Sequence, residues 1–194
     1  MTSHRSDLGR DLARIAVFAA LIVVLGTVTV PLPGGVPLTA QTLGVMLAGT
    51  VLGPRKAPLA VLLVLVLAAV GLPVLAGGRG GLGVFAGPTA GYLLGWIAGA
   101  IIIGLIARGG RITWWRTALG AVVGGILVVY LFGIPVQALV LGVDLAPTAL
   151  SSLVFLPGDL LKAAAATVLT LALLRAYPPA FGRRPALGAP ARAV

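Results

Sequence analysis

Long apolar stretches alternate with short polar or glycine- and proline-rich stretches along the chain. A transmembrane helix needs about 20 apolar residues, and six stretches reach or approach that length. They cover approximately residues 12–30, 38–52, 59–75, 84–107, 117–141 and 150–174. The pattern therefore predicts an all-α membrane protein with six transmembrane helices.

The interruptions between the apolar stretches are short, so we expect no second domain. They read PLPGGVP (31–37), GPRKAP (53–58), AGGRGG (76–81), RGGRITWWR (108–116) and GVDLAP (142–147). We expect one six-helix transmembrane domain over residues 12–175. A polar tail (1–11) would precede it, and a disordered tail rich in Pro, Arg and Ala (176–194) would follow it.

Composition and charge support the membrane assignment. Hydrophobic residues make up 59% of the chain and charged residues 9%, whereas a soluble domain carries roughly 25% charged residues. The lipid bilayer is therefore the expected environment. Six crossings put both termini on one side, together with 12 of the 14 Lys and Arg residues, and the positive-inside rule makes that side the cytoplasm. Arg far outnumbers Lys, as is typical of proteins from GC-rich bacterial genomes. We therefore expect the membrane to be a bacterial cytoplasmic membrane.

Missing residue types narrow the chemistry. The chain has no Cys and no Glu, and its one His, His4, lies near the N-terminus. Thiolate metal sites, zinc-protease motifs and Ser-His catalysis therefore have no candidate residues, and we expect no enzyme activity, metal or cofactor. The net charge of +10 does not indicate nucleic acid, because the basic residues lie in short loops and tails. No Walker motif is present, so energy for any transport must come from partners or a gradient.

Two charged residues, Asp159 and Lys162, interrupt the last apolar stretch. They are three residues apart and share one face of a helix, and Pro157 and Gly158 indicate a helix break or a helix start just before them. An embedded Asp or Lys costs about 2.5–3.5 kcal/mol near a helix centre, so such residues usually mark a ligand site. A structural ion pair is the alternative. A proton relay through Asp159 is the third.

The segment VPLTAQTL (36–43) is the second polar feature. Thr39 and Gln41 share a face if the backbone is extended and diverge if it is helical, and Thr42 follows them. The amide of Gln41 offers a donor and an acceptor, which suits a urea or amide ligand. For Thr39 the alternative is helix capping.

The glycine-rich loop carries Arg79, the one basic residue on the outer side, and Tyr92 follows it on the fourth apolar stretch. The loop is a candidate lid over an outward-facing cavity, or else a flexible connector. Tyr92 would supply a ring and a hydroxyl to that cavity. Its alternative place is the aromatic belt at the membrane interface.

Three stretches, in this order and spacing, resemble the BioY family, the substrate-binding (S) components of energy-coupling-factor (ECF) biotin transporters. They are VPLTAQTLGVMLAGTVLGPRKA (36–57), GLPVLAGGRGGLGVFAGPTAGYLLGW (71–96) and LPGDLLKAAAA (156–166). The likeness extends over about residues 13–175 and departs at Ala90, where the family commonly has Gly.

The resemblance implies an S-component fold with an outward-side pocket for biotin. It implies that Thr39, Gln41, the loop with Arg79, Asp159 and Lys162 line that pocket, while Tyr92 is a candidate from the residues alone. Which of Asp159 and Lys162 meets which end of biotin stays open. The implied partners are a transmembrane coupling subunit and two ABC-type ATPases, docked through a small-residue stripe on the first helix that here runs from Ala16 and Ala20 to Val24.

Other functions stay open at this point. An S component for another vitamin would look similar. A structural membrane subunit with an incidental Asp159–Lys162 pair is the other alternative. A homo-oligomer is also compatible with the sequence.

Overall fold

The structure is a computed structural model that describes residues 2–30 and 36–181. Its elements are α1 (Thr2–Leu25), β1 (Thr29–Val30), β2 (Leu38–Thr39), α2 (Gln41–Leu52), α3 (Ala57–Ala69), η1 (Ala76–Gly78), η2 (Leu82–Phe85), α4 (Ala90–Arg108), α5 (Trp114–Val122), η3 (Val123–Val128), α6 (Val129–Leu141), α7 (Leu145–Ser152), η4 (Leu153–Phe155), α8 (Leu156–Ala176) and η5 (Pro178–Phe181).

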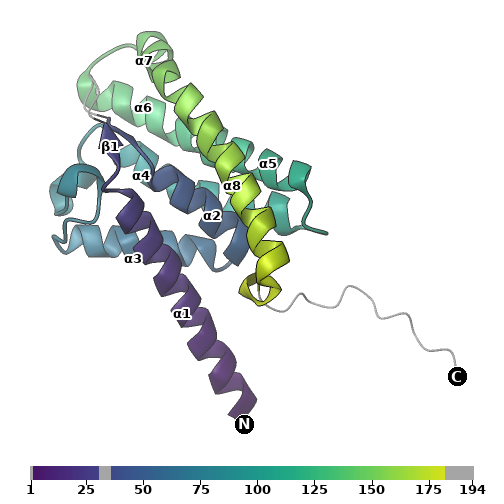
Figure 1. Ribbon diagram of the computed structural model, residues 1–194. Helices are drawn as coiled ribbons and strands as arrows, with labels where there is room; N and C mark the ends of the chain where they lie inside the picture. Colours follow the sequence, from purple (N-terminus) through teal and green to yellow (C-terminus); the bar gives the residue numbers. More distant parts are fainter. Residues whose placement is uncertain (1, 31–35, 182–194) are drawn as a thin grey trace, which may run out of the picture.

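The described residues form six helical passes, which confirms the predicted number (Figure 1). The fifth pass, Trp114–Leu141, joins α5, the π-helical turn η3 and α6, and the sixth, Leu145–Ala176, joins α7, η4 and α8. These two and α4 are long and apolar enough to cross a membrane. Helices α2 and α3 are apolar but shorter, so their place in the bundle depends more on packing against the other helices than on their own length.

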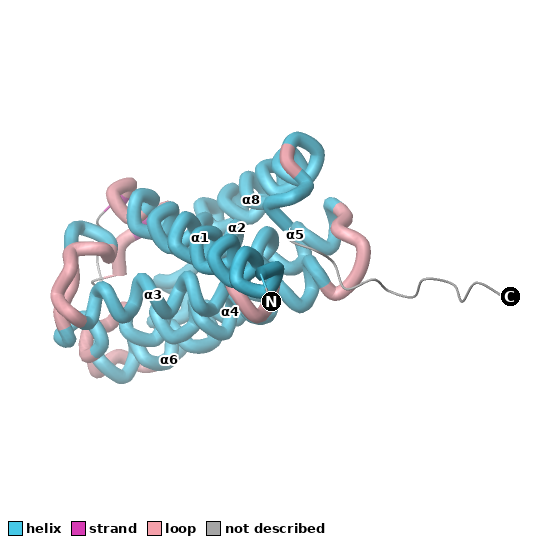
Figure 2. Tube along the Cα trace, turned by 90° about the horizontal axis from the view of Figure 1, so that it is seen from below, coloured by secondary structure: helices cyan, strands magenta, loops and turns pink. Residues whose placement is uncertain are grey.

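Helix α4 is at the centre of the bundle and packs against α2, α3, α5 and α6. Seen from below, α1 and α6 lie on opposite sides of α3 and α4 (Figure 2). Gly91, Gly95 and Gly99 recur every fourth residue and form the face of α4 that meets the fifth pass. A Cβ at Gly91 would lie 2.3 Å from the carbonyl oxygen of Phe132. Small residues at this spacing let two membrane helices approach closely.

A two-stranded antiparallel ribbon, which the sequence analysis did not predict, joins α1 to α2 through pairing of β1 with β2. The loop between α3 and α4 is built from the short helices η1 and η2. Gly77, Gly78 and Gly81 have φ values of 70°, 70° and 87° there, a region that residues with a Cβ rarely adopt. The glycines therefore let the loop turn back on itself.

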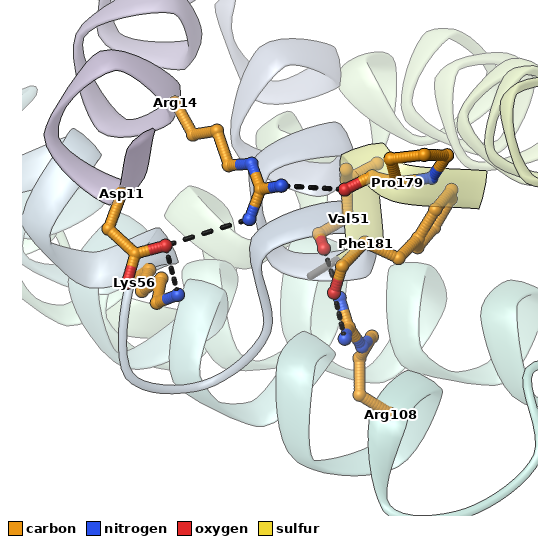
Figure 3. A network of polar contacts seen from close by, with 7 residues as sticks. All are labelled: Asp11, Arg14, Val51, Lys56, Arg108, Pro179 and Phe181. Carbon is orange, nitrogen blue, oxygen red and sulfur yellow. Dashed lines mark hydrogen bonds and ion pairs between the residues drawn. The ribbon is translucent and has the colours of Figure 1, made fainter. Parts of the chain in front are cut away.

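The N-terminal part of α1 and the end of α8 lie at the same end of the bundle, opposite the ribbon (Figure 1). A polar network joins them there (Figure 3). Asp11 accepts contacts from Lys56 Nζ at 2.5 Å and from Arg14 Nη1 at 3.6 Å. Arg14 Nη2 also donates to the Pro179 carbonyl at 2.6 Å, so this network connects α1 to the segment after α8.

Arg108, at the end of α4, extends this network. It donates to the carbonyl of Val51 and, at 2.5 Å, to the carbonyl of Phe181. Its guanidinium lies 5.6 Å from the centre of the Phe181 ring. Ordered elements extend into both segments that the sequence analysis placed outside the transmembrane domain. Helix α1 begins at Thr2 within the predicted tail, and Phe181 is buried within the other. Residues 182–194 lie outside the described residues.

Candidate ligand-binding pocket

A pocket lies near the ribbon end of the bundle and draws its walls from β2, α2, η1, α4, η3, α6 and α8. All six residues singled out from the sequence line it: Thr39, Gln41, Arg79, Tyr92, Asp159 and Lys162. The other lining residues are Val36, Pro37, Leu38, Thr42, Leu75, Ala76, Thr89, Leu93, Trp96, Gly125, Val129, Tyr130 and Phe155. Most are apolar, so the few polar groups are candidates for orienting a ligand.

Asp159 and Lys162 lie at the start of α8, as the sequence predicted. Asp159 is in the first turn, where the helix dipole favours a carboxylate. Lys162 Nζ lies 2.7 Å from Asp159 Oδ1, and both side chains are largely buried, with exposed fractions of 14% for Lys162 and 7% for Asp159. The two charges therefore neutralise each other beside the pocket, which lowers the cost of embedding them.

Two further residues complete this charged group. Lys162 Nζ donates to Thr42 Oγ1 at 3.0 Å, and the Tyr130 hydroxyl donates to Asp159 Oδ2 at 2.7 Å. The carboxylate thus has a partner on each oxygen, and the ammonium uses two of its three N–H groups. Tyr130 was missed from the sequence, because a single tyrosine in an apolar helix carries no spacing signal. Thr42 was noted beside Thr39 and Gln41 but given no role.

Gln41 and Thr39 both border the pocket, but they interact mainly with the protein. Gln41 is 1% exposed. Its Nε2 donates to the Val74 carbonyl and its Oε1 accepts from the Ala76 amide, each at 3.1 Å. Thr39 Oγ1 accepts from the Gln41 backbone N–H at 3.3 Å, a local contact between residues two apart, whereas the N-cap residue of α2 is Ala40. The Gln41 amide is therefore engaged by the loop between α3 and α4.

Tyr92 is buried between helices, away from the position that an interface belt would require. It is 8% exposed, and its hydroxyl donates to Gln137 Oε1 at 2.8 Å. The rings of Tyr92 and Tyr130 meet edge to face with centres 6.4 Å apart. Tyr92 therefore contributes its ring to the pocket wall, because its hydroxyl is hydrogen-bonded to Gln137 of α6.

Arg79 differs from Lys162 in having no carboxylate beside it among the described residues. Its Nε donates to the Ala76 carbonyl at 3.1 Å, which fixes the guanidinium against the loop. Asp159 and Lys162 cancel, so the pocket walls carry one uncompensated positive charge. Such a pocket is complementary to a ligand with one negative charge.

Comparison with known proteins agrees with this architecture. The family model described as BioY family matches residues 1–179. The chain belongs to the BioY family.

Two curated proteins are similar to this chain over most of their own length. The protein described as biotin transporter BioY from Rhizobium etli is 48% identical over 179 residues, which cover 87% of this chain and 95% of that protein. A protein with the same description from Rhodobacter capsulatus is 51% identical over 168 residues, 79% of this chain and 87% of its own.

A solved structure shares the fold. It is the crystal structure of the S-component for biotin from an ECF-type ABC transporter. It superposes with a TM-score of 0.82 at 31% sequence identity, and the alignment covers 90% of this chain and 95% of that chain. The likeness confirms the predicted S-component fold.

Proposed function

We propose that this protein binds biotin from the outside and mediates its uptake as the substrate-capture subunit of an ECF-type transporter. The observation that carries the proposal is that one pocket is lined by residues from separate parts of the chain. They are Thr39, Gln41, Arg79, Tyr92, Asp159 and Lys162. The identity to proteins described as biotin transporters supports the choice of ligand.

The charges of the pocket suggest how biotin is oriented. Biotin has a carboxylate at one end and an uncharged urea at the other. The carboxylate pairs with Arg79, the cation without a carboxylate partner among the described residues, because a planar guanidinium binds carboxylates through two parallel hydrogen bonds. The guanidinium nitrogens Nη1 and Nη2 are the groups for this pairing, since Nε is held by the Ala76 carbonyl.

The urea lies against the Asp159–Lys162 pair. A urea carries one acceptor and two N–H donors, and the pair supplies a donor for the former and an acceptor for the latter. The third N–H of Lys162 donates to the urea oxygen, and the remaining lone pairs of Asp159 accept from a urea nitrogen. An internally neutral pair suits an uncharged group, because no net charge has to be buried with it. The apolar walls, including Trp96 and Phe155, take the rings and the chain.

The proposed transporter requires partners that supply energy. Helix α1 presents Ala16 and Ala20 at the molecular surface, next to Val24, which is 62% exposed. Small residues on an exposed face permit close helix contact, so this stripe is the proposed docking face for the coupling subunit, to which two ATPases would bind. The clustering of Arg14, Lys56 and Arg108 at the end opposite the pocket (Figure 3) supports cytoplasmic termini.

The direct test is equilibrium binding of radiolabelled biotin to the detergent-purified protein, with a panel of other vitamins as competitors. The proposal expects saturable binding that unlabelled biotin displaces and other vitamins do not. Displacement by a different vitamin at lower concentration would assign the pocket to that vitamin. Absence of saturable biotin binding by a monodisperse, helical preparation would overturn the proposal.

A further inference from the structure

The loop between α3 and α4 covers the pocket through a short, self-contained segment, residues 74–79. Leu75 and Arg79 exchange backbone hydrogen bonds of 3.0 and 3.2 Å, so the segment closes on itself as a small hydrogen-bonded loop. Leu75, Ala76 and Arg79 line the pocket. At its base, Gly81 donates to the Ala68 carbonyl of α3 at 2.7 Å. The segment is therefore anchored to α3 on one side, and its residues Leu75 and Ala76 are buried, at 4% and 5% exposed. A second hydrogen-bonded anchor would fix its other side.

Gln41 supplies that second anchor. Its amide pairs with the segment as a neighbouring strand would, accepting from the Ala76 N–H and donating to the Val74 carbonyl, both at 3.1 Å. Among the described residues, no other side chain forms hydrogen bonds with both of these backbone groups. Gln41 begins α2, so these two bonds tie the roof of the pocket to a helix of the bundle.

The end of α1 holds the Gln41 side chain in place. A Cβ at Gly26 would lie 2.7 Å from Gln41 Nε2 and 2.8 Å from its Cδ, so the amide is in close contact with the backbone at this glycine. With Gly26 on one side and the 74–76 backbone on the other, the amide has no room to turn toward a ligand. Its burial, at 1% exposed, is consistent with this.

We propose that Gln41 is a positioning residue that holds residues 74–79 closed over the pocket, so that breaking its two hydrogen bonds governs ligand entry and release. Gln41 then acts on biotin only through the loop. This inference rests on the proposed function for the identity of the ligand. The closure of the loop is a property of the ligand-free protein and does not depend on which ligand binds.

The experiment measures hydrogen exchange of residues 74–79 in the ligand-free protein, and biotin release, for the wild type and Gln41→Ala. Loss of two hydrogen bonds of about 1 kcal/mol each corresponds to roughly 30-fold faster exchange and release. Gln137→Ala is the matched control: Gln137 is also a buried glutamine, 4% exposed, but its amide oxygen accepts from Tyr92. Exchange of the loop in that variant should equal the wild type.

Two further variants keep the test decisive if Gln41→Ala does not fold. Gln41→Glu keeps an acceptor for the Ala76 N–H but replaces the donor to the Val74 carbonyl with a second carboxylate oxygen in a buried site. Repulsion between these oxygens should give an acceleration of the same sign, at least as large as in Gln41→Ala. Gly26→Ala displaces the amide without removing it. Alone, it should also accelerate loop exchange, because the displaced amide no longer reaches the Val74 and Ala76 backbone groups. Where Gln41→Ala folds, adding Gly26→Ala to it should change loop exchange little, because the side chain that it displaces is then absent.

The outcomes separate the two proposals. Unchanged loop exchange in Gln41→Ala and Gln41→Glu would overturn the inference, and weaker biotin binding in the same samples would instead make Gln41 a ligand contact. Faster loop exchange with an unchanged rate of biotin release would show that the loop does not govern release. Faster loop exchange in a protein that never binds biotin would leave the closure intact and overturn the proposed function.

Discussion

Replacement of Arg79 by Gln tests the assignment of the biotin carboxylate. The change removes the positive charge and keeps a polar side chain on the loop. With Nε committed to the Ala76 carbonyl, the two remaining nitrogens give a pair of charge-assisted hydrogen bonds. Each hydrogen bond to a charged group contributes about 1.5–3 kcal/mol, so a fully buried pair would contribute about 3–6 kcal/mol, which is more than roughly a 100-fold change in affinity. Arg79 is half-buried, so solvent screening places the expected loss at roughly 10- to 50-fold.

The assay compares two ligands, biotin and its neutral carboxamide, by titration against purified wild-type protein and Arg79→Gln. The wild type should prefer biotin, and the variant should lose this preference while binding the carboxamide as before. Lys56→Gln is the matched control. It also removes one positive charge, but Lys56 pairs with Asp11 at the opposite end of the bundle, so both affinities should be retained. Equal weakening of biotin and carboxamide by Arg79→Gln would refute the reasoning, because the effect would then come from the loop.

Three further sets of substitutions test other parts of the structure. Lys162→Met should weaken biotin and its carboxamide alike, by roughly 10- to 100-fold, because its proposed partner is the urea; a loss confined to biotin would reverse the assigned orientation. The hydroxyls of Thr50 and Thr170 are fully buried and 2.8 Å apart, so each Thr→Val change should lower stability in a detergent unfolding assay by about 0.6–2 kcal/mol. The double variant should lose less than the sum. Gly91→Ala should lower stability by about 1–3 kcal/mol, since its Cβ would meet a carbonyl oxygen of α6, whereas Gly83→Ala, with open space around it, should not.

Much of the architecture was predictable because it depends on local properties. The length of each apolar stretch determines whether it can span a bilayer as a helix, so the six helical passes follow from the sequence. The pairing of Asp159 with Lys162 was predictable for the same reason, because residues three apart on a helix are neighbours whatever surrounds them. The start of α8 just before Asp159 followed from Pro157, which is tolerated in the first turn of a helix.

The contacts of the pocket depended on distant residues. Gln41 was expected to meet the ligand because an amide suits a urea, but the structure directs it to a backbone 33 to 35 residues later in the chain. Tyr130 reaches Asp159 only because the fifth pass, Trp114–Leu141, packs against the sixth through α5 and η3. A sequence pattern reports which side chains share a face, whereas the packing of helices selects which faces meet.

By itself, the sequence determined the class of protein, the number of helical passes, the asymmetric distribution of charge and the helical neighbours Asp159 and Lys162. Each depends on hydrophobicity, charge or helix periodicity over a few residues. Only the tertiary structure decided that Asp159 is held by both Lys162 and Tyr130, that Gln41 binds the loop, and that Phe181 is buried against the end of the bundle. These contacts join residues far apart in the chain, and their geometry exists only once the helices have packed.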